Sequence, residues 1–404
     1  MLPALAPCSA AMRSTGPAVM AASAELVDAL VPLERIGTRL NVRRNEDVYA
    51  KGAASVRRRK TFDISPANST QILRRGDQSG SEIIFGEANK IPPNSIHTFT
   101  DPDLYSAALH KGLVQLTLKQ CGVFNARLCT INLHHLSVQS FSEDLARTFH
   151  VESSGERAFI AFRTRPGPPI IRNGTELSTS SIALQPPCES YDEHTSGPTS
   201  HVEMSLPWGC MHSLSETTIR YGLLLRTGAK ILTPLPDTME KLKRLFKAAA
   251  DLAEYAPAIL LCLGAARGLE QALVEAIMEC LGGSEVNEDR AALRRHAAIM
   301  RRFHRVIEEH LDQPLYITEI CKEVGASTRT LNVCCQEHLG MAPKRYLLLR
   351  RMHMVRRALR DSSPAKTTVT EIATRYGFWQ FGRLAAEYKA LFGQLPSATL
   401  ACLQ

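Results

Sequence analysis

Two patterns of hydrophobic positions divide the chain. From about residue 82 to residue 234, apolar residues alternate with polar ones in short runs, such as Val114, Leu116 and Leu118. Gly, Pro, Asn and Ser separate these runs. Alternation with a period of two is typical of half-buried β-strands. The segment is therefore predicted to be β-rich, either a cupin-like barrel or a sandwich.

After Pro236 the apolar period changes to 3.6 residues, which predicts helices that close the β-rich domain. Asp237 followed by Glu240 resembles a capping box, and Gly282 with Gly283 is expected to end the second helix. The two apolar stripes are Met239, Leu242, Leu245, Phe246, Ala249 and Leu252, then Leu269, Leu273, Ile277 and Leu281. Two interpretations stay open, because such stripes form either a domain core or a helical dimer interface.

The last hundred residues contain one short pattern twice. In residues 316–332, Thr318 is expected to cap a short helix, Gly325 to end it, and Ser327 to cap the next helix. Residues 368–384 repeat the Thr, Glu-Ile and Gly positions. A repeat in which the residues that begin and end the helices recur at matching positions is stronger evidence than either copy alone. The pattern predicts two helix-turn-helix motifs.

Pro343 to Arg360 lie between the two copies and predict a single helix, with the proline in its first turn. Eighteen residues at 1.5 Å each give a length of about 27 Å. Such a spacer can hold two recognition helices about one DNA turn, roughly 34 Å, apart. The arrangement therefore favours one polypeptide that reads two neighbouring major-groove segments.

Residues along the paired motif form one recognisable set: Ile320–Gly325, Ser327, Arg329, Leu331 and Gly340–Tyr346, then Arg351–Arg356 and Leu359, then Ile372–Phe378, Tyr388, Lys389, Gly393 and Pro396. With this set, the segment from about Arg295 to Leu400 resembles the AraC/XylS family of transcription activators. The resemblance implies a seven-helix domain that binds double-stranded promoter DNA and contacts RNA polymerase. It also implies an N-terminal domain that senses a small-molecule effector or forms a homodimer, and segments around residues 99–103, 162–167 and 266–272 weakly resemble such domains.

Carried over by this resemblance, the base-reading residues are Arg329, Asn332 and Val333 on the first recognition helix and Gln380, Phe381, Arg383 and Ala386 on the second. Arginine suits guanine, and asparagine or glutamine suits adenine. Trp379 and Phe381 either press on thymine methyl groups or pack inside the domain. The chain departs from the family, which usually has Arg at the positions of Val333 and Ala386, and a core aromatic at those of Cys335 and Leu384.

Cations near the two motifs are expected to hold phosphates without reading bases. The predicted phosphate contacts are Ser327, Lys344, Arg345, Arg350, Arg356 and Lys389. Arg351 has two open interpretations, an internal structural role or a DNA contact. The charge distribution supports a nucleic-acid partner: residues 290–404 hold 19 Lys and Arg against 9 Asp and Glu, whereas the whole chain has a net charge of only +8.

No catalytic, nucleotide-binding or metalloprotease motif occurs in the sequence, so we expect no enzyme activity, no cofactor and no metal. His134 and His135 are expected within one strand over residues 126–138, with one ring satisfied in the core rather than binding metal. The rival class is an enzyme with a helix-turn-helix appendage. A reactive cysteine of low pKa would mark it, and Cys121 or Cys129 would be the first to alkylate.

The predicted organisation is a flexible tail over residues 1–80, a β-rich sensory or dimerisation domain over 81–283, a linker over 284–294 and a DNA-binding domain over 295–404. Eleven cysteines without metal spacing indicate reduced thiols in the cytoplasm. A signal peptide is disfavoured because the basic leading region is missing. No segment is long and apolar enough to span a membrane. The expected function is an activator of transcription, with a repressor or a ligand-independent regulator as the alternative.

Overall fold

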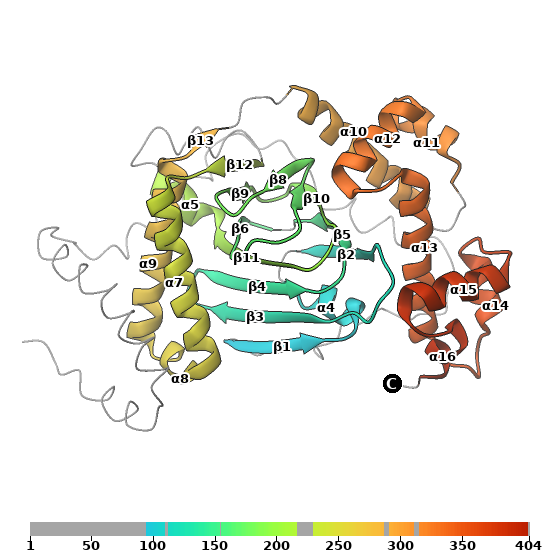
Figure 1. Cartoon of the computed structure of the whole chain (residues 1–404), viewed down its shortest axis with the longest axis horizontal. Helices are drawn as coiled ribbons and strands as arrows, with labels where there is room; N and C mark the ends of the chain where they lie inside the picture. The colour runs from blue at the N-terminus through green and yellow to red at the C-terminus, as the bar shows by residue number, and fades with distance from the viewer. Residues whose placement is uncertain are drawn as a thin grey trace, which may run out of the picture.

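The structure, a computed structural model, describes residues 94–402 apart from 110–111, 154, 216–228, 287–290 and 311–314. Four layers follow one another across the molecule: a helix pair, a large sheet, a small sheet and a helical domain (Figure 1). The expected tail over residues 1–80 lies outside the described residues.

Two antiparallel sheets form the β-rich domain. The large sheet has the order β1-β3-β4-β11-β6-β9-β12-β13, and the small sheet has the order β2-β5-β10-β7-β8. The strands of the large sheet are β1 Ser95–Phe99, β3 Ala126–Asn132, β4 Ser137–Glu143, β6 Arg157–Arg163, β9 Ile182–Gln185, β11 Thr199–Pro207, β12 Lys230–Thr233 and β13 Glu285–Val286. Those of the small sheet are β2 Leu113–Leu118, β5 Arg147–Glu152, β7 Ile170–Arg172, β8 Thr175–Leu177 and β10 Ser190–Thr195. The β-rich prediction is confirmed, in its sandwich form.

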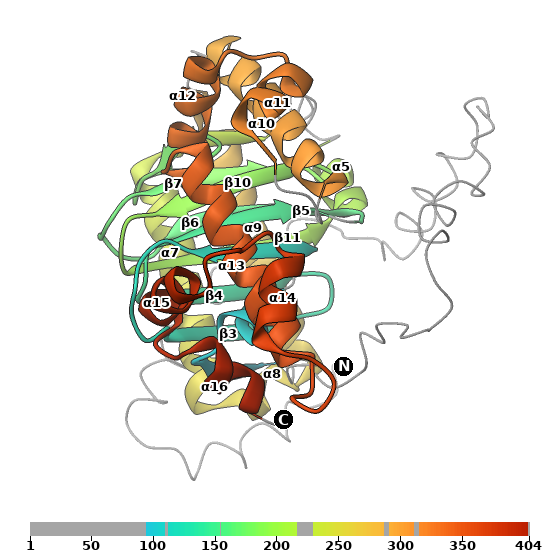
Figure 2. The same ribbon diagram turned by 90° about the vertical axis from the view of Figure 1, so that its right-hand side faces the viewer.

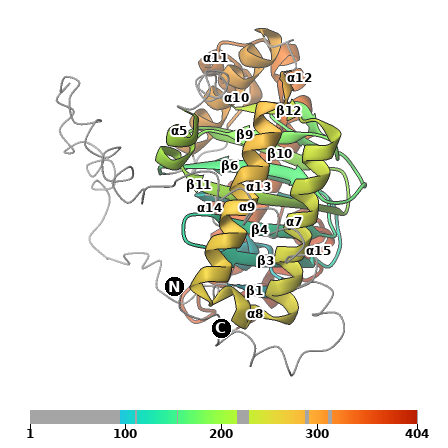
Figure 3. The ribbon, with the colours of Figure 1, turned by 90° about the vertical axis from the view of Figure 1, so that its left-hand side faces the viewer.

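Helices α7 (Pro236–Tyr255) and α9 (Leu263–Gly282) cross the outer face of the large sheet, joined by α8 (Pro257–Leu260) (Figure 3). Both apolar stripes are buried in one cluster with sheet residues such as Ile131 and Phe162. The core interpretation is therefore confirmed, since residues that face the sheet cannot form a dimer interface. The expected end at Gly282 and Gly283 is confirmed. The capping box at Asp237 was wrong, because Leu235 precedes the helix without a side-chain cap.

Alternation decides which way each strand residue points. In β5, Arg147 forms an ion pair with Glu143 of the opposite sheet, whereas Thr148 and His150 contact the helical domain. Two short helices complete this domain, α4 (Pro102–Ala107) and α5 (Trp208–Ser215). The small sheet thus has one face toward the sandwich interior and the other toward the helical domain.

The predicted strand over residues 126–138 was wrong at its centre. Strand β3 ends at Asn132, and the backbone N–H of Leu133 donates to the carbonyl of Leu136 at 2.9 Å. This turn places His134 in solvent and leaves His135 half-buried. Neither ring is a core histidine.

Seven described helices form the C-terminal domain, as the resemblance implies. They are α10 Ala291–Glu309, α11 Ile317–Val324, α12 Thr328–Leu339, α13 Pro343–Arg360, α14 Val369–Arg375, α15 Phe381–Phe392 and α16 Pro396–Ala401. Helix α13 has the predicted bounds. Helix α10 begins four residues before the expected start of the domain, and β13 extends the large sheet through part of the expected linker. None of the described helices could cross a membrane.

Candidate DNA-binding surface

Local capping signals build each helix-turn-helix unit. Ser327 accepts the backbone N–H of Thr330 at 3.1 Å, and Thr368 accepts that of Glu371 at 3.2 Å, so the expected cap at Ser327 is confirmed. Gly325 ends α11 with a φ of 68°, a left-handed conformation that favours glycine. The cap at Thr318 was wrong, because α11 already begins at Ile317, after Tyr316.

Helix α13 separates the two units, with α11 and α12 at one end and α14 and α15 at the other (Figures 1 and 2). The two candidate recognition helices, α12 and α15, thus lie near opposite ends of the spacer helix. A helix of 18 residues is about 27 Å long. This is the order of one DNA turn, as expected from the sequence.

The first recognition helix presents its N-terminal half to solvent. Arg329 is exposed, and 42% of Val333 is exposed despite its apolar side chain. Asn332 is half-buried and donates its amide N–H to the carbonyl of Thr328 at 2.8 Å. DNA bases would compete with this local bond for the Asn332 amide.

The second recognition helix begins at Phe381, so Gln380 lies at its cap position. Trp379 is 71% exposed and Phe381 is 40% exposed, which argues against the packing interpretation for both rings. Arg383 is exposed and donates from Nε to Glu387 at 2.8 Å. A large aromatic side chain in water loses the stabilisation of burial, so a partner that covers it is favoured.

The predicted phosphate contacts fall into two groups. Ser327, Lys344, Arg345 and Lys389 are exposed, whereas Arg350 and Arg356 are buried. Arg356 is ion-paired with Asp101 and Asp103, and Arg350 lies 3.6 Å from Glu308. In this arrangement Arg350 and Arg356 face acidic side chains inside the protein, whereas the other four residues face solvent.

Arg351 also lies on α13, but it contacts an aromatic ring instead of an acidic side chain. Its guanidinium lies 5.3 Å from the centre of the Phe378 ring, over the second helix-turn-helix unit. The side chain is half-buried, and burial lowers its pKa from the usual value. These contacts favour the internal structural role.

Known proteins match this end of the chain. Residues 320–401 match the family described as "Helix-turn-helix domain". Over 94 residues the chain is 45% identical to the "Probable thc operon regulatory protein" of Rhodococcus erythropolis, and over 124 residues it is 33% identical to the "XylDLEGF operon transcriptional activator" of Pseudomonas putida. These matches cover 23% and 31% of this chain, and 28% and 38% of the relatives. The chain therefore spans well under half the length of the curated relatives it matches.

Residues 320–401 form a helix-turn-helix domain of the AraC/XylS type. Among solved structures, the AraC-like transcriptional activator CuxR matches with 15% identity and a TM-score of 0.37, over 70% of this chain and all of that one. ToxT from Vibrio cholerae matches with 11% identity and a TM-score of 0.24, over 66% of this chain and 98% of that one.

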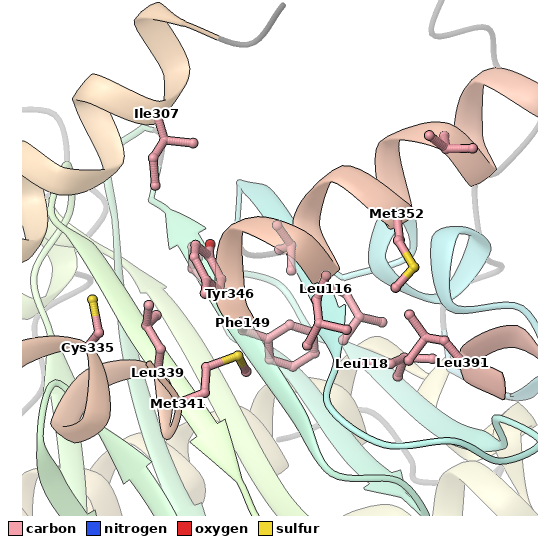
Figure 4. Close-up of a cluster of buried hydrophobic side chains, with 14 of the residues drawn as sticks. Leu116, Leu118, Phe149, Ile307, Cys335, Leu339, Met341, Tyr346, Met352 and Leu391 are labelled. Atoms are coloured by element: carbon pink, nitrogen blue, oxygen red, sulfur yellow. The ribbon is translucent and has the colours of Figure 1, made fainter. Parts of the chain in front are cut away.

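The AraC/XylS-type domain packs on the small sheet. Thr148 donates to the carbonyl of Leu339 at 2.9 Å, and the backbone N–H of Leu118 donates to Nε2 of His353 at 3.0 Å. One buried hydrophobic cluster includes residues of both domains, among them Phe149 and Tyr346 (Figure 4). The position of the AraC/XylS-type domain is thus set by apolar burial together with specific hydrogen bonds.

Charged side chains fill the interior of the β-sandwich. Arg147 contacts Glu143 at 2.8 Å and Glu193 at 2.7 Å, and Arg172 contacts Glu193 at 2.6 Å. Tyr191 donates to Glu203 at 3.2 Å. All of these side chains are buried, so removing one partner would leave an uncompensated charge. The network occupies space that a small molecule would need inside the sandwich.

Cys129 lacks the environment of a reactive thiolate. Burial raises the pKa of Cys129 to about 11, the opposite of what a reactive thiolate requires. Cys121 is exposed. The expectation that Cys129 would alkylate early was wrong, because its strand is covered by α7.

Sequence reasoning missed one cluster, His150, Asp192, His304 and His338. Its members come from β5, β10, α10 and α12, with no fixed spacing between them, so no local pattern could have revealed it. The cluster lies where the AraC/XylS-type domain meets the small sheet.

Proposed function

We propose that this chain is a sequence-specific transcription regulator that binds double-stranded promoter DNA. The observation that carries the proposal is the pair of recognition helices, α12 and α15, at the two ends of α13, with Arg329 and Arg383 exposed. Exposed arginines at such positions can donate two hydrogen bonds to guanine in the major groove. Lys344, Arg345 and Lys389 supply exposed positive charge for phosphates.

The proposed effect on transcription is activation, with RNA polymerase as a protein partner, because a relative is named as a transcriptional activator. The β-sandwich is the proposed sensor, and the cytoplasm is the compartment in which a promoter-binding protein acts. A homodimer would have to use surfaces other than the two apolar stripes, because these are core. We assign no catalytic role, because the relatives are regulators and the buried Cys129 thiol is not activated.

The test is selection of bound duplexes from a random pool by the full chain. Enrichment of a bipartite site, with two half-sites about one DNA turn apart, is expected. Arg329→Ala and Arg383→Ala should each cost about 1 to 3 kcal/mol of binding free energy and relax the preference at one position in one half-site.

Arg305→Ala is the matched control, since this arginine is also exposed in the same domain but lies on α10, outside the recognition helices. It should leave the selected sequence unchanged. Uniform weakening on every sequence by the Arg329 and Arg383 variants would make them phosphate contacts instead. No enriched sequence for the wild type would refute the proposal.

A further inference from the structure

Three ligand-type side chains converge at the contact between the two domains. Nδ1 of His150 and Nε2 of His304 each lie 2.8 Å from Oδ1 of Asp192, and Nδ1 of His338 lies 3.7 Å from Oδ2. The donor atoms of His150, Asp192 and His304 all lie within 4.8 Å of one another. All four residues are at least nine-tenths buried. Such a group is rare in an interior unless its members have a shared partner.

One hydrogen bond within the group, between Nδ1 of His150 and Oδ1 of Asp192 at 2.8 Å, does not account for it. Both ring nitrogens of His304 and both of His338 lack a hydrogen-bond partner, although Nε2 of His304 is close to Asp192. Nε2 of His304 and Oδ1 of Asp192 are therefore close enough for a hydrogen bond but are not aligned for one. The rings of His150 and His304 are also stacked, with centres 3.6 Å apart. Several buried nitrogen lone pairs or N–H groups are left to be satisfied.

We propose that His150, Asp192 and His304 bind one divalent transition-metal ion, with His338 as the fourth ligand, and that the ion fastens the AraC/XylS-type domain to the β-sandwich. Imidazole nitrogens with one carboxylate oxygen suit zinc and its neighbours rather than magnesium or calcium. Around a tetrahedral zinc ion, bonds of about 2.0 Å place the ligand atoms about 3.3 Å apart. The distances of 2.8 and 3.7 Å lie on either side of this value, and the stacked rings of His150 and His304 have to turn so that both lone pairs point at one ion.

The surroundings have the charge that a divalent ion requires. Oε1 of Glu152 lies 3.8 Å from Nε2 of His150, the nitrogen that faces away from Asp192. A carboxylate behind a ligand histidine fixes the ring and strengthens it as a ligand. Glu308 of α10 joins the same group, with its carboxylate within 4.8 Å of His150 and Glu152. Two carboxylates from different domains repel each other, and a nearby cation removes this cost.

In the metal-free cluster, burial would lower the pKa of His150, but its hydrogen bonds with Asp192 and Glu152 raise it to about 9, so a metal ion has to displace a proton from this ring. Burial alone would raise the pKa of Asp192, but the contacts with His304, His150 and His338 hold it well below its usual range. Burial lowers the pKa of His304 to about 4, which keeps its ring neutral. An ionised carboxylate and a neutral imidazole are the forms that bind metal.

This inference extends the proposed function, because the ligands come from both domains. The bound ion would hold the arrangement in which Arg356 and its neighbours on α13 are paired with Asp101 and Asp103. Those cations are then withheld from phosphates. The metal-bound form should therefore bind DNA more weakly than the metal-free form.

The test of the site uses Zn²⁺ and Co²⁺ with the full chain and no DNA. After removal of metal by a chelator, the wild type should bind one equivalent of Zn²⁺ by calorimetry, and Co²⁺ should give the intense visible bands of a four-coordinate site. Asp192→Asn and His304→Gln should each weaken binding by about a hundredfold or more. His353→Gln is the matched control, a buried histidine at the same contact but outside the cluster, and should bind Zn²⁺ as the wild type does.

Absence of a stoichiometric site in the folded wild type would overturn the proposal, even if a cluster variant failed to fold. Equal weakening by His353→Gln and His304→Gln would overturn it too, since the effect would then follow from a loosened interface. Binding of duplex DNA by the metal-free chain tests the proposed function alone. Saturating Zn²⁺ should raise the Kd for DNA by about tenfold, which is about 1.4 kcal/mol, and an unchanged Kd would overturn the coupling.

Discussion

Arg356 of the spacer helix α13 donates to the carboxylate of Asp101 at 2.6 Å, and this contact joins the two domains. Asp101 also caps α4, where it accepts the backbone N–H groups of Asp103 and Leu104. Asp103 pairs with Arg357 at 2.8 Å, and Arg360 lies 2.7 Å from Asp101. Burial opposes ionisation of Asp101, but the hydrogen bond and charge of Arg356 lower its pKa overall. Two aspartates of the β-domain thus neutralise a cationic stretch of the spacer.

The double variant Asp101→Asn, Asp103→Asn should bind random-sequence duplex more tightly than the wild type. Asparagine keeps the cap of α4, while Arg356, Arg357 and Arg360 lose their counter-charges. If these arginines then reach phosphates, the slope of log Kd against log salt should steepen by about 0.9 for each new contact. Binding measured by fluorescence anisotropy over a series of salt concentrations gives this slope.

The double variant Asp237→Asn, Glu240→Gln controls for the change of two in net charge, because both residues are exposed on α7, on the other side of the large sheet (Figure 1). It should leave the slope almost unchanged. An equal slope for the double variant Asp101→Asn, Asp103→Asn and the wild type would contradict a phosphate role for Arg356.

Lys344→Ala should weaken DNA binding and Arg350→Ala should weaken folding, although both residues lie on α13 and both are predicted phosphate contacts. Lys344 is exposed, so its loss should reduce the salt slope by about 0.9 and leave unfolding unaffected. Arg350 is buried near Glu308, so its loss should lower the free energy of unfolding and leave the slope unchanged. Salt titrations and urea unfolding of both variants would separate the roles. A reduced slope for Arg350→Ala would show that the domains rearrange on DNA.

The parts of this structure that the sequence predicts are those set by local chemistry. Helix α13 has the predicted bounds because Pro343 fixes its first turn, and α12 begins after Ser327 because that hydroxyl caps it. Alternation likewise predicted a β-rich domain, and only the structure decided that it is a sandwich rather than a cupin-like barrel. The apolar stripe around Leu242 and Leu273 predicted buried helices, and only the sheet beneath them decided that they are core.

Contacts between distant segments were outside the reach of pattern reasoning. Arg350 and Arg356 carry the same charge as Lys344 and lie on the same helix. Only the docking of α13 on the β-domain determines which of these cations are buried and which are exposed. The sequence pattern predicts a strand through His134 and His135 because the two-residue period continues across the turn that interrupts it. The cluster around Asp192 joins four elements, and no spacing in the sequence indicates it.

Gly340→Ala should destabilise the protein more than Gly325→Ala. Both glycines end a helix with φ near 67°, so an added Cβ costs about 1 kcal/mol at each from backbone strain alone. At Gly340 the Cβ would also clash with Nζ of Lys119 and lie 2.6 Å from Nδ1 of His194, whereas at Gly325 nothing lies within 4 Å. His194 belongs to the small sheet, so the added cost falls on the contact between domains. Chemical unfolding of both variants measures the difference, and equal losses would show that the Lys119 and His194 side chains move aside freely.

The buried ring of His353 should make the stability of the wild type fall in acid. Burial lowers its pKa to about 3, with Arg357 and Arg356 acting in the same direction and Asp103 and Asp101 in the opposite one. The unfolded chain, with a pKa near 6.5, takes up the proton first as the pH falls, so stability is lost progressively from pH 6.5 toward pH 3. At pH 5 the loss from this group is about 2 kcal/mol relative to neutral pH.

His353→Gln isolates this contribution, because an amide oxygen can still accept the backbone N–H of Leu118 but does not titrate. The other histidines titrate equally in both proteins and cancel in the comparison. The variant should therefore lose about 2 kcal/mol less than the wild type between pH 7 and pH 5, as measured by urea unfolding at each pH. An identical loss in the two proteins would mean that His353 becomes protonated within the folded chain, which requires the contact between α13 and β2 to open before the protein unfolds.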